Sequence, residues 1–376
     1  MGTTVVFTGG GSGGHVFPGI AVIERLKAAR PDFDICWIGS GAQVEREIVA
    51  RFDIPFYPIP SGKLRRYLSV WNFFDLFKIV AGLVSACILL LRLRPALVFS
   101  KGGYVSVPPV VAARLLGIPV YTHDSDVDPG LATKINARFA EKIFVAYQES
   151  CNYFPLPLRK SVVVVGNPVR TEILSGDGAR GKSYVGAPHG KLLLLVLGGS
   201  LGARQVNELA DAAYDSLSRD YFIVHQTGSA AGAIGIDAGR NAAKGGRFST
   251  EFLAAEYADV LAAADLVVSR AGGGTLWEIA SMGKPSILIP LDTGSSRGDQ
   301  LRNAERFEKG GASVVLAGPL ATPANLAAEA GRLARHPVEL LHMGAIAKEM
   351  ARTDAAGEIA RMITERIGGA HGARPA

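Results

Sequence analysis

Three glycine-rich turns in this 376-residue chain have the composition of phosphate-binding loops. They read TGGGSGGH (8–15), GGSLGA (198–203) and SRAGGGTLWE (269–278), and each follows an apolar stretch and precedes a helical pattern. At such a junction, backbone N–H groups and the helix dipole favour an anion, and glycine allows its close approach. A single loop of this kind also fits a plain tight turn, but three together indicate a phosphorylated ligand.

The first turn ends in His15, whose ordinary pKa suits a general base. A hydrogen bond at a helix start, or a contact with a bound diphosphate, is the alternative. The turn also matches GxGxxG, but a dinucleotide site needs an acid at the end of the second strand. That strand, FDICWIGS, ends in Ile38, Gly39 and Ser40 without one. We therefore reject a nicotinamide-dependent dehydrogenase.

The elements that must position these turns are short apolar runs alternating with helical patterns, which predict parallel sheets covered by helices on both faces. The cycle of strand, glycine-rich turn and helix starts twice, about 190 residues apart. We predict an α/β protein with two Rossmann-like domains. The expected divisions are an N-terminal domain (1–165), a linker (166–190), a C-terminal domain (191–350), and a last helix packing back on the first domain, with a tail (351–376).

The cysteines and the N-terminal sequence indicate the cellular compartment of the protein. Cys36, Cys87 and Cys151 are an odd number without CxxC spacing, which argues for a reducing compartment and against a disulfide scaffold or zinc site. The start MGTTVVFTGG lacks a basic segment followed by an apolar core, so we expect no secretory signal and a cytosolic protein.

Six motifs follow one another between about residues 5 and 310: GGGSGGHVFPGIAV, SKGGYVSVPPVVAARLLGIPVYTHDSD, GNPVR, LGGSLGARQVNE, SRAGGGTLWEIASMGKPSILIPL and GDQLRNA. In these motifs and their order the chain resembles the MurG family of glycosyltransferases. The resemblance implies a GT-B fold, with two Rossmann-like domains facing across a cleft. The implied reaction is inverting transfer of N-acetylglucosamine from UDP-N-acetylglucosamine to the 4-hydroxyl of N-acetylmuramyl-(pentapeptide)-pyrophosphoryl-undecaprenol, which converts lipid I into lipid II.

The resemblance makes His15 and Asp124 the candidates for the catalytic base. Asp124 lies in His-Asp-Ser-Asp (123–126), where the family normally has His-Glu-Gln-Asn. Asp126 replaces an asparagine that contacts the donor, and an ionised aspartate accepts hydrogen bonds but donates none. This departure leaves open another lipid acceptor or a UDP-N-acetylglucosamine 2-epimerase, and Asp126 also fits a turn that caps the next helix.

The donor site implied by the resemblance would bind the diphosphate through Arg170 and Ser200, the ribose through Glu278 and the sugar through Gln300. The alternatives are a hinge ion pair for Arg170, a helix cap for Ser200 and a solvated helix position for Glu278; Asp299 stands where the family has glutamine. The full donor set is Ser12, Gly13, Gly14, Asp126, Arg170, Ser200, Leu253, Gly273, Gly274, Thr275, Leu276, Glu278 and Gln300. Since helix N-termini can stabilise the departing diphosphate, we expect no cofactor and no essential metal.

The apolar stretch 68–95 raises the question of a membrane. Its uncharged run, 79–91, has 13 residues, whereas a transmembrane helix needs about 20, so we predict a core helix there. Aromatic and basic residues before it suit contact with anionic headgroups, and we expect peripheral attachment at the cytoplasmic face of the cell membrane and no nucleic-acid partner. The residues expected to contact the membrane are Lys63, Arg65, Arg66, Trp71, Phe74 and Lys78.

Overall fold

The structure, a computed structural model, describes residues 3–11, 13–62, 70–198, 202–228, 242–244, 246–291, 298–352 and 354–372. The chain forms two compact units. The first comprises Met1–Arg170 and Thr353–Ala376, and the second comprises Thr171–Arg352.

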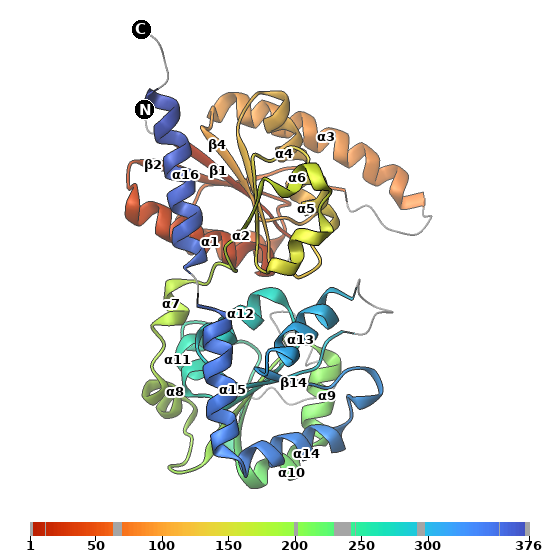
Figure 1. The fold of residues 1–376 in the computed structure, drawn as a ribbon, viewed down its shortest axis with the longest axis vertical. Helices are drawn as coiled ribbons and strands as arrows, with labels where there is room; N and C mark the ends of the chain where they lie inside the picture. The colour runs from red at the N-terminus through yellow and green to blue at the C-terminus, as the bar shows by residue number, and fades with distance from the viewer. Residues whose placement is uncertain are drawn as a thin grey trace. The chain divides into compact units, whose positions relative to one another are not determined.

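The first unit contains, within the described residues, a seven-stranded parallel sheet in the order β3-β2-β1-β4-β5-β6-β7 (Figure 1). Its strands are β1 (Thr3–Thr8), β2 (Phe33–Gly39), β3 (Phe56–Pro58), β4 (Leu97–Ser100), β5 (Val120–Asp124), β6 (Lys142–Val145) and β7 (Val162–Val164). Its helices are α1 (Gly13–Ala29), α2 (Gln43–Ala50), α3 (Val70–Leu93), α4 (Val107–Leu115), α5 (Leu131–Asn136), α6 (Leu156–Arg159) and α16 (Ala355–Gly372), with short 3-10 turns at Tyr104–Ser106 and Gln148–Tyr153.

Helices cover both faces of this sheet because successive side chains of a strand point to opposite faces. On β1, Val5 and Phe7 are buried in a cluster with α1, α2 and α16. Val6, between them, is buried in a second cluster with α3 and α4. The strand is continuously apolar in sequence because both faces of the sheet are covered by helices.

The last helix, α16, belongs to the first unit and packs along α1 (Figure 1). Ile359 and Ile363 on this helix are fully buried in the core that α1 and β1 share. Arg366 adds a bidentate ion pair with Glu141, with N–O distances of 2.8 and 3.0 Å. The C-terminal segment thus completes the first domain.

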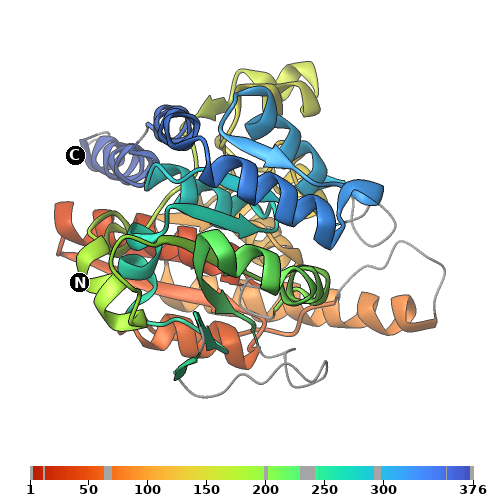
Figure 2. The ribbon, with the colours of Figure 1, turned by 90° about the horizontal axis from the view of Figure 1, so that it is seen from below.

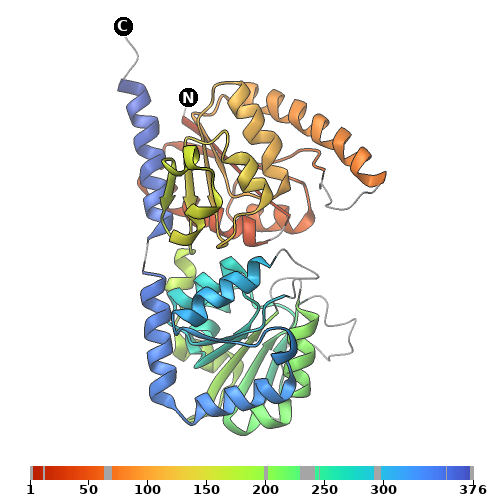
Figure 3. The same cartoon turned by 45° about the vertical axis from the view of Figure 1, so that its right-hand side comes forward.

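The second unit has, among its described residues, a seven-stranded sheet in the order β10-β11-β9-β8-β12-β13-β14, in which only β10 runs antiparallel to its neighbour (Figure 3). Its strands are β8 (Leu192–Leu197), β9 (Tyr221–Gln226), β10 (Ala242–Lys244), β11 (Arg247–Thr250), β12 (Leu266–Ser269), β13 (Ser286–Leu288) and β14 (Ser313–Val315). Its helices are α7 (Thr171–Leu174), α8 (Gly178–Val185), α9 (Arg204–Ala212), α10 (Tyr214–Asp220), α11 (Tyr257–Ala263), α12 (Gly273–Ser281), α13 (Asp299–Lys309), α14 (Pro323–Ala334) and α15 (Pro337–Met350), with a 3-10 turn at Gly318–Leu320. The prediction of two Rossmann-like domains with parallel sheets is confirmed.

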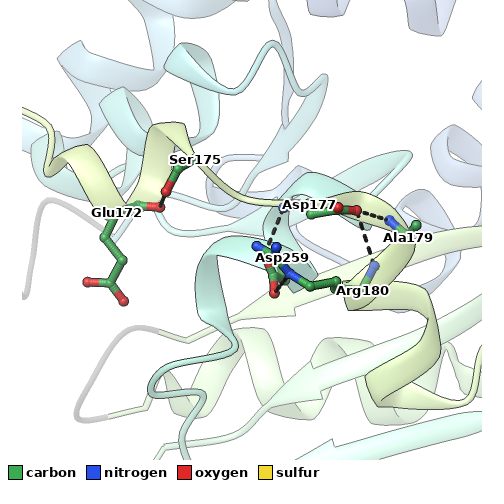
Figure 4. Close-up of polar contacts among 6 residues, drawn as sticks. All are labelled: Glu172, Ser175, Asp177, Ala179, Arg180 and Asp259. Atoms are coloured by element: carbon green, nitrogen blue, oxygen red, sulfur yellow. Dashed lines mark hydrogen bonds and ion pairs between the residues drawn. The ribbon is translucent and has the colours of Figure 1, made fainter.

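The linker predicted at 166–190 is mostly folded structure of the second unit (Figure 4). The Asp177 carboxylate caps α8 by accepting the N–H groups of Ala179 (2.7 Å) and Arg180 (3.2 Å). Both oxygens of Asp259, on α11, accept 2.8 Å hydrogen bonds from the Arg180 guanidinium. The Gly- and Pro-rich composition misled us because it marks short capped helices here.

Helix α3 departs from our prediction that 79–91 is a core helix. Ala86 and Leu90 are buried against the sheet, but Val80, Val84 and Ile88 are exposed by 53, 54 and 46%. In Figures 1 and 2 the helix also extends beyond the sheet of its own unit. One face of α3 is thus an exposed apolar stripe. Of the helices described, none has the length and apolar character needed to cross a membrane.

Candidate active site

The two sheets place the glycine-rich turns where ligands of open α/β sheets bind, at the carboxyl ends of strands beside the point where strand order reverses. In the first sheet that point lies between β1 and β4, and in the second between β8 and β12. The first turn follows β1, the second follows β8 and the third follows β12. Ser12 and Ser200 lie outside the described residues.

The first turn is held from inside by Glu45, a side chain of α2 that is 1% exposed. Its carboxylate accepts the N–H of Gly11 (2.6 Å), the N–H of Ser40 (2.8 Å) and the hydroxyl of Ser40 (2.7 Å). A Cβ at Gly10 would collide with this carboxylate. A buried carboxylate bonded to this amide disfavours a phosphate at the same place, which agrees with the rejection of a dinucleotide site.

The second wall of this site is the loop after β4. Gly103 has φ +78°, and a Cβ there would collide with the carbonyl oxygen of Gly10. Glycine is required at this position both for its backbone conformation and for the close packing of the two loops. The loops after β1 and β4 therefore form one unit of structure.

His15 lies in the first turn of α1, half-buried, between buried Val16 and exposed Gly14. Its Nδ1 lies 3.2 Å from the carbonyl oxygen of Lys101. Because a carbonyl only accepts hydrogen bonds, this contact assigns the proton to Nδ1 and leaves the lone pair of the neutral ring on Nε2. In this tautomer the nitrogen that can accept a proton is Nε2.

Asp124 ends β5 and has both carboxylate oxygens engaged by backbone N–H groups. Oδ1 accepts from Asp126 (3.0 Å) and Oδ2 accepts from Gly130 (2.9 Å). These bonds close the turn that leads into α5. The neighbouring His123 is fully buried and donates from Nε2 to the carbonyl of Gly166 (2.9 Å). Burial lowers the pKa of His123 well below its ordinary value, so this ring stays neutral.

The aspartates at 124 and 126 form an Asp-x-Asp triplet. Asp126 is half-buried, and the oxygens of Asp124 are turned to the backbone. Across the described ranges, no group of three or more His, Cys, Asp or Glu side chains is placed to hold a metal ion.

Arg170 is the last residue of the first unit. Its guanidinium carbon lies 4.2 Å from the ring centre of Phe17, on α1. This cation–π contact places the arginine against the same helix turn that carries His15. The resemblance assigned it to the donor diphosphate, and the structure gives it a position beside the first glycine-rich turn.

The third glycine-rich turn opens α12, whose N-terminal residues are Gly273 and Gly274. The turn is anchored from α13, where buried Asn303 donates from Nδ2 to the carbonyl of Ala271 (3.1 Å). An added Cβ at Gly272 or Gly274 would meet no atom within 4 Å. The protein itself therefore does not need glycine there for space, whereas a ligand approaching the backbone would.

Glu278 lies on α12 one turn after the glycines, half-buried, and its Oε2 accepts the hydroxyl of Tyr257 (3.0 Å). Thr275 is half-buried, whereas the Leu276 side chain is fully buried. Leu276 can thus offer a ligand only its backbone in this conformation. Tyr257, the first residue of α11, escaped sequence analysis because a lone tyrosine has no signature.

Leu253 and Gln300 complete the predicted donor residues. The Leu253 side chain is 2% exposed and its N–H donates to Oε1 of Gln226 (3.0 Å), at the end of β9. Gln300 is the second residue of α13, and its Oε1 accepts the N–H of Leu291 (3.2 Å). Both residues therefore belong to segments that follow strand carboxyl ends of the second sheet.

Arg270 is a further residue that the sequence alone did not single out. It follows β12 directly, in the third glycine-rich turn. It is partly buried, and burial lowers the pKa of its guanidinium. Its Nε is buried without a hydrogen-bond partner in the described part of the chain. A cation in a turn that favours anions is a natural phosphate ligand.

Family comparison agrees with this architecture. The glycosyltransferase family 28 N-terminal domain matches residues 5–145, and the glycosyltransferase family 28 C-terminal domain matches residues 193–359. These matches fall in the first and second units respectively, except for the last seven residues of the second match. The fold and the glycine-rich turns thus define a glycosyltransferase of the GT-B class.

Individual relatives identify the group within glycosyltransferase family 28 to which the chain belongs. A Treponema denticola protein, named UDP-N-acetylglucosamine–N-acetylmuramyl-(pentapeptide) pyrophosphoryl-undecaprenol N-acetylglucosamine transferase, is 47% identical over 332 residues, covering 84% of each chain. A Bacillus anthracis protein of the same name, numbered 2, is 43% identical, covering 83% of this chain and 86% of its own. The crystal structure of Acinetobacter baumannii MurG matches with TM-score 0.72 and 27% identity over 97% of this chain and 100% of its own. The chain therefore belongs to glycosyltransferase family 28 and, within it, to the MurG family.

More distant structures share the fold alone. A UDP-N-acetylglucosamine 2-epimerase matches with TM-score 0.66 at 15% identity, covering 100% of this chain and 98% of its own. This likeness is one of fold alone, and it does not support epimerase activity.

Proposed function

We propose that this enzyme transfers N-acetylglucosamine from UDP-N-acetylglucosamine to the 4-hydroxyl of N-acetylmuramyl-(pentapeptide)-pyrophosphoryl-undecaprenol. The product is lipid II, the disaccharide precursor of peptidoglycan. The observation that carries this proposal is the 47% identity, over 84% of both chains, to a relative that bears the name of this activity. The glycine-rich turn after β12 supports it, since the donor substrate carries a diphosphate.

The donor belongs to the second unit in this proposal. The N–H groups that open α12, at Gly273 and Gly274, would face the UDP phosphates together with Arg270. The Glu278 carboxylate would accept the ribose hydroxyls, and Gln300 would contact the sugar. Positive groups at the phosphates stabilise the negative charge that UDP gains as it leaves.

His15 is our choice for the general base. As the 4-oxygen of the acceptor bonds to the anomeric carbon, the bond from that carbon to the UDP oxygen breaks and the configuration inverts. The hydroxyl proton would pass to Nε2 of His15, whose lone pair is fixed by the Nδ1 contact with the Lys101 carbonyl. Asp124 is less suited, because both of its oxygens already accept backbone N–H groups.

A lipid-linked acceptor calls for a membrane-docking surface, and we place it on α3. Its exposed apolar stripe consists of Phe77, Val80, Val84, Ile88 and Leu91. The Lys78 side chain, 57% exposed, lies beside it and suits anionic headgroups. Peripheral attachment at the cytoplasmic face of the membrane is therefore part of the proposal.

Five other residues were expected at the membrane. Three of them lie outside the described part of the chain; the other two lie on α3, but their side chains are not described. The first group is Lys63, Arg65 and Arg66, and the second is Trp71 and Phe74. The stripe on α3 extends the predicted surface toward the end of the helix.

Two incubations test the reaction. With radiolabelled UDP-N-acetylglucosamine and a lipid I analogue, we expect label in a disaccharide lipid and release of UDP. With the donor alone, a 2-epimerase would form UDP-N-acetylmannosamine, whereas the proposed transferase leaves the sugar unchanged. Label that stays in the nucleotide sugar in the first incubation, or epimer in the second, would refute the proposal.

A further inference from the structure

A chain of polar side chains lies at the carboxyl end of β9, in the second unit, and neither the motifs nor the proposed reaction gives it a role. His225, on this strand, and Asn207, on α9, are both fully buried. Nε2 of His225 lies 3.0 Å from Oδ1 of Asn207, and its Nδ1 lies 2.6 Å from a guanidinium nitrogen of Arg247, the first residue of β11. Since buried polar groups are costly unless they are hydrogen-bonded, the direction of these bonds shows what the chain holds.

The hydrogen bonds of this chain all run in one direction. A guanidinium only donates, so Arg247 donates to Nδ1 of His225, and the proton of the neutral ring lies on Nε2. That N–H donates to Oδ1 of Asn207, whose Nδ2 donates in turn to the carbonyl of Thr227 (2.8 Å). Burial, and after it the charge of Arg247, lowers the pKa of His225 to about 3, so the ring stays neutral. We call Arg247, His225 and Asn207 the β9 relay.

The outer end of the β9 relay is fixed by contacts of Arg247 with two helices. Oδ1 of Asp211, one turn after Asn207 on α9, accepts from the guanidinium over 2.6 Å. The guanidinium carbon also lies 5.5 Å from the ring centre of Tyr214, on α10, which is a cation–π contact. These contacts hold the guanidinium in the position from which it donates to His225.

The inner end of the β9 relay lies where three loops meet. The N–H of Thr227 donates to the carbonyl of Thr250 (2.9 Å), which joins the loop after β9 to the loop after β11. Gln226 accepts the N–H of Gly198, in the second glycine-rich turn, on its carbonyl (3.4 Å), and the N–H of Leu253 on its side chain (3.0 Å). These loops follow β8, β9 and β11, at the same edge of the sheet as the reversal of strand order between β8 and β12, where ligands of such sheets bind.

We propose that the β9 relay positions the loops after β8, β9 and β11 for the UDP half of the donor, with Asn207, His225 and Arg247 as positioning residues. The inference rests on the proposed function, because it takes a nucleoside diphosphate as the ligand of the second unit. The relay acts through Thr227 and its neighbours and does not itself touch the ligand. Its loss should weaken the binding of UDP and leave the chemical step nearly unchanged.

The direction of the β9 relay is tested by NMR without any ligand. The histidines are labelled with ¹⁵N, and the signals of His225 are identified by their loss in His225→Gln. We expect a neutral ring with its proton on Nε2, unchanged between about pH 5.5 and 8. A proton on Nδ1, or a ring that titrates in this range, would overturn the relay.

The positioning role is tested by calorimetric titration with UDP. His225→Leu removes both hydrogen bonds of the ring, whereas His225→Gln keeps a side-chain N–H that can donate to Asn207. We expect the Kd for UDP to rise about three- to tenfold in His225→Leu, the scale of one lost hydrogen bond, and to stay within about twofold of wild type in His225→Gln. Equal Kd values in the two variants would overturn the positioning role.

Arg247 gives a second pair of variants at the partly exposed end of the relay, in case His225→Leu does not fold. Arg247→Met removes the donor to His225, whereas Arg247→Lys keeps a charged donor on a long side chain. The Kd for UDP should rise in Arg247→Met about as much as in His225→Leu, and Arg247→Lys should restore most of the loss. A wild-type Kd in folded Arg247→Met would count against the relay.

Tyr221, at the opposite end of β9, supplies a matched control. It is fully buried, and its hydroxyl donates to the carbonyl of Ala330 (2.9 Å). Tyr221→Phe therefore loses one buried hydrogen bond from the same strand, away from the carboxyl end. It should lower the denaturant midpoint and leave the Kd for UDP unchanged. A rise in Kd as large as that in His225→Leu would show that stability alone governs binding, and would overturn the inference.

The inference and the proposed function fail in different ways. With UDP-N-acetylglucosamine and a lipid I analogue, His225→Leu should raise KM for the donor and leave kcat nearly unchanged. A wild type that binds UDP in a relay-dependent manner but makes no disaccharide lipid refutes the proposed function and leaves the inference standing. A wild type that makes the lipid, with one KM for the donor in all variants, overturns the inference alone, and a wild type that binds no UDP overturns it as well.

Discussion

The hydroxyl of Tyr257 donates a 3.0 Å hydrogen bond to Oε2 of Glu278. Tyr257 is the first residue of α11, and Glu278 follows the glycines at the start of α12. The bond therefore links the loop after β11 to the loop after β12. A carboxylate that must accept two ribose hydroxyls needs a fixed rotamer, and a tyrosine hydroxyl on one oxygen fixes it. Tyr257 thus orients the acid of the proposed donor site.

Replacing Tyr257 by phenylalanine should therefore weaken donor binding. We expect KM for UDP-N-acetylglucosamine to rise about three- to tenfold, the effect of losing one intramolecular hydrogen bond, with kcat little changed. Steady-state kinetics with the lipid I analogue saturating measures it. Tyr184→Phe, on α8, is the control, because that tyrosine packs against Phe248 and should leave KM as it is. A fall in kcat at constant KM would contradict the assignment.

The two candidates for the base differ in what their side chains already bind. His15→Gln should lower kcat about 10²- to 10⁴-fold, the range for loss of a general base, with little change in the affinity for UDP-N-acetylglucosamine. Asp124→Asn should instead lower stability, because an amide nitrogen cannot accept the N–H of Gly130 or Asp126. Single-turnover rates and denaturant midpoints separate the two. A larger rate loss in Asp124→Asn than in His15→Gln, at equal folded fraction, would reverse the assignment.

Membrane attachment through α3 predicts a clear effect of charge on its apolar stripe. The double variant Val84→Asp, Ile88→Asp should lower the fraction bound to anionic vesicles at least tenfold, since each apolar side chain contributes roughly 1.5–3 kcal/mol when buried. Flotation with vesicles containing phosphatidylglycerol measures the bound fraction. Val338→Asp, at a position 78% exposed on α15, should leave binding unchanged. Equal binding by both variants would exclude α3 as the docking surface.

The buried ammonium of Lys101 predicts a dependence of stability on pH. Its folded-state pKa of about 8 lies below the ordinary value of about 10.4. Between these values the unfolded chain binds more protons, so this group makes stability rise as pH increases through the window and adds nothing to the slope below it. The charged or titratable groups around it are Asp124, Asp126, His15 and His123.

Unfolding midpoints from pH 7 to 10.5 should accordingly rise more in wild type than in Lys101→Met. In Asp126→Asn the rise should begin at a lower pH, because one of the two carboxylates that favour the charged lysine is gone. Parallel curves for wild type and Lys101→Met would show that Lys101 has an ordinary pKa.

Patterns that repeat along the chain were predictable from sequence. Continuous apolar strands with a glycine-rich turn and helix after them gave two parallel sheets, and the glycines place the turns at strand ends. Lys101, Glu45 and Tyr257 were not predictable, because each makes a side-chain contact across 21 to 34 residues of sequence. Such contacts exist only once the loops after neighbouring strands come together.

The exposed side of α3 could not be predicted from sequence for a different reason. A run without charged residues from 79 to 91 has no polar face, so periodicity does not tell an outward side from an inward one. Only the packing of Ala86 and Leu90 on the sheet fixes which side faces out. The segment at 171–185 was missed because its helices are short and depend on the Asp177 cap and the Arg180–Asp259 pair.

The most direct test of the central claim is the structure of the product. Wild-type enzyme is incubated with UDP-N-acetylglucosamine and a lipid I analogue, and the lipid product is characterised by mass spectrometry and NMR. The account predicts a mass gain of one N-acetylhexosamine and a β-linkage from its anomeric carbon to the 4-oxygen of the muramyl sugar. An α-linkage, attachment at another hydroxyl, or an unmodified acceptor would contradict it.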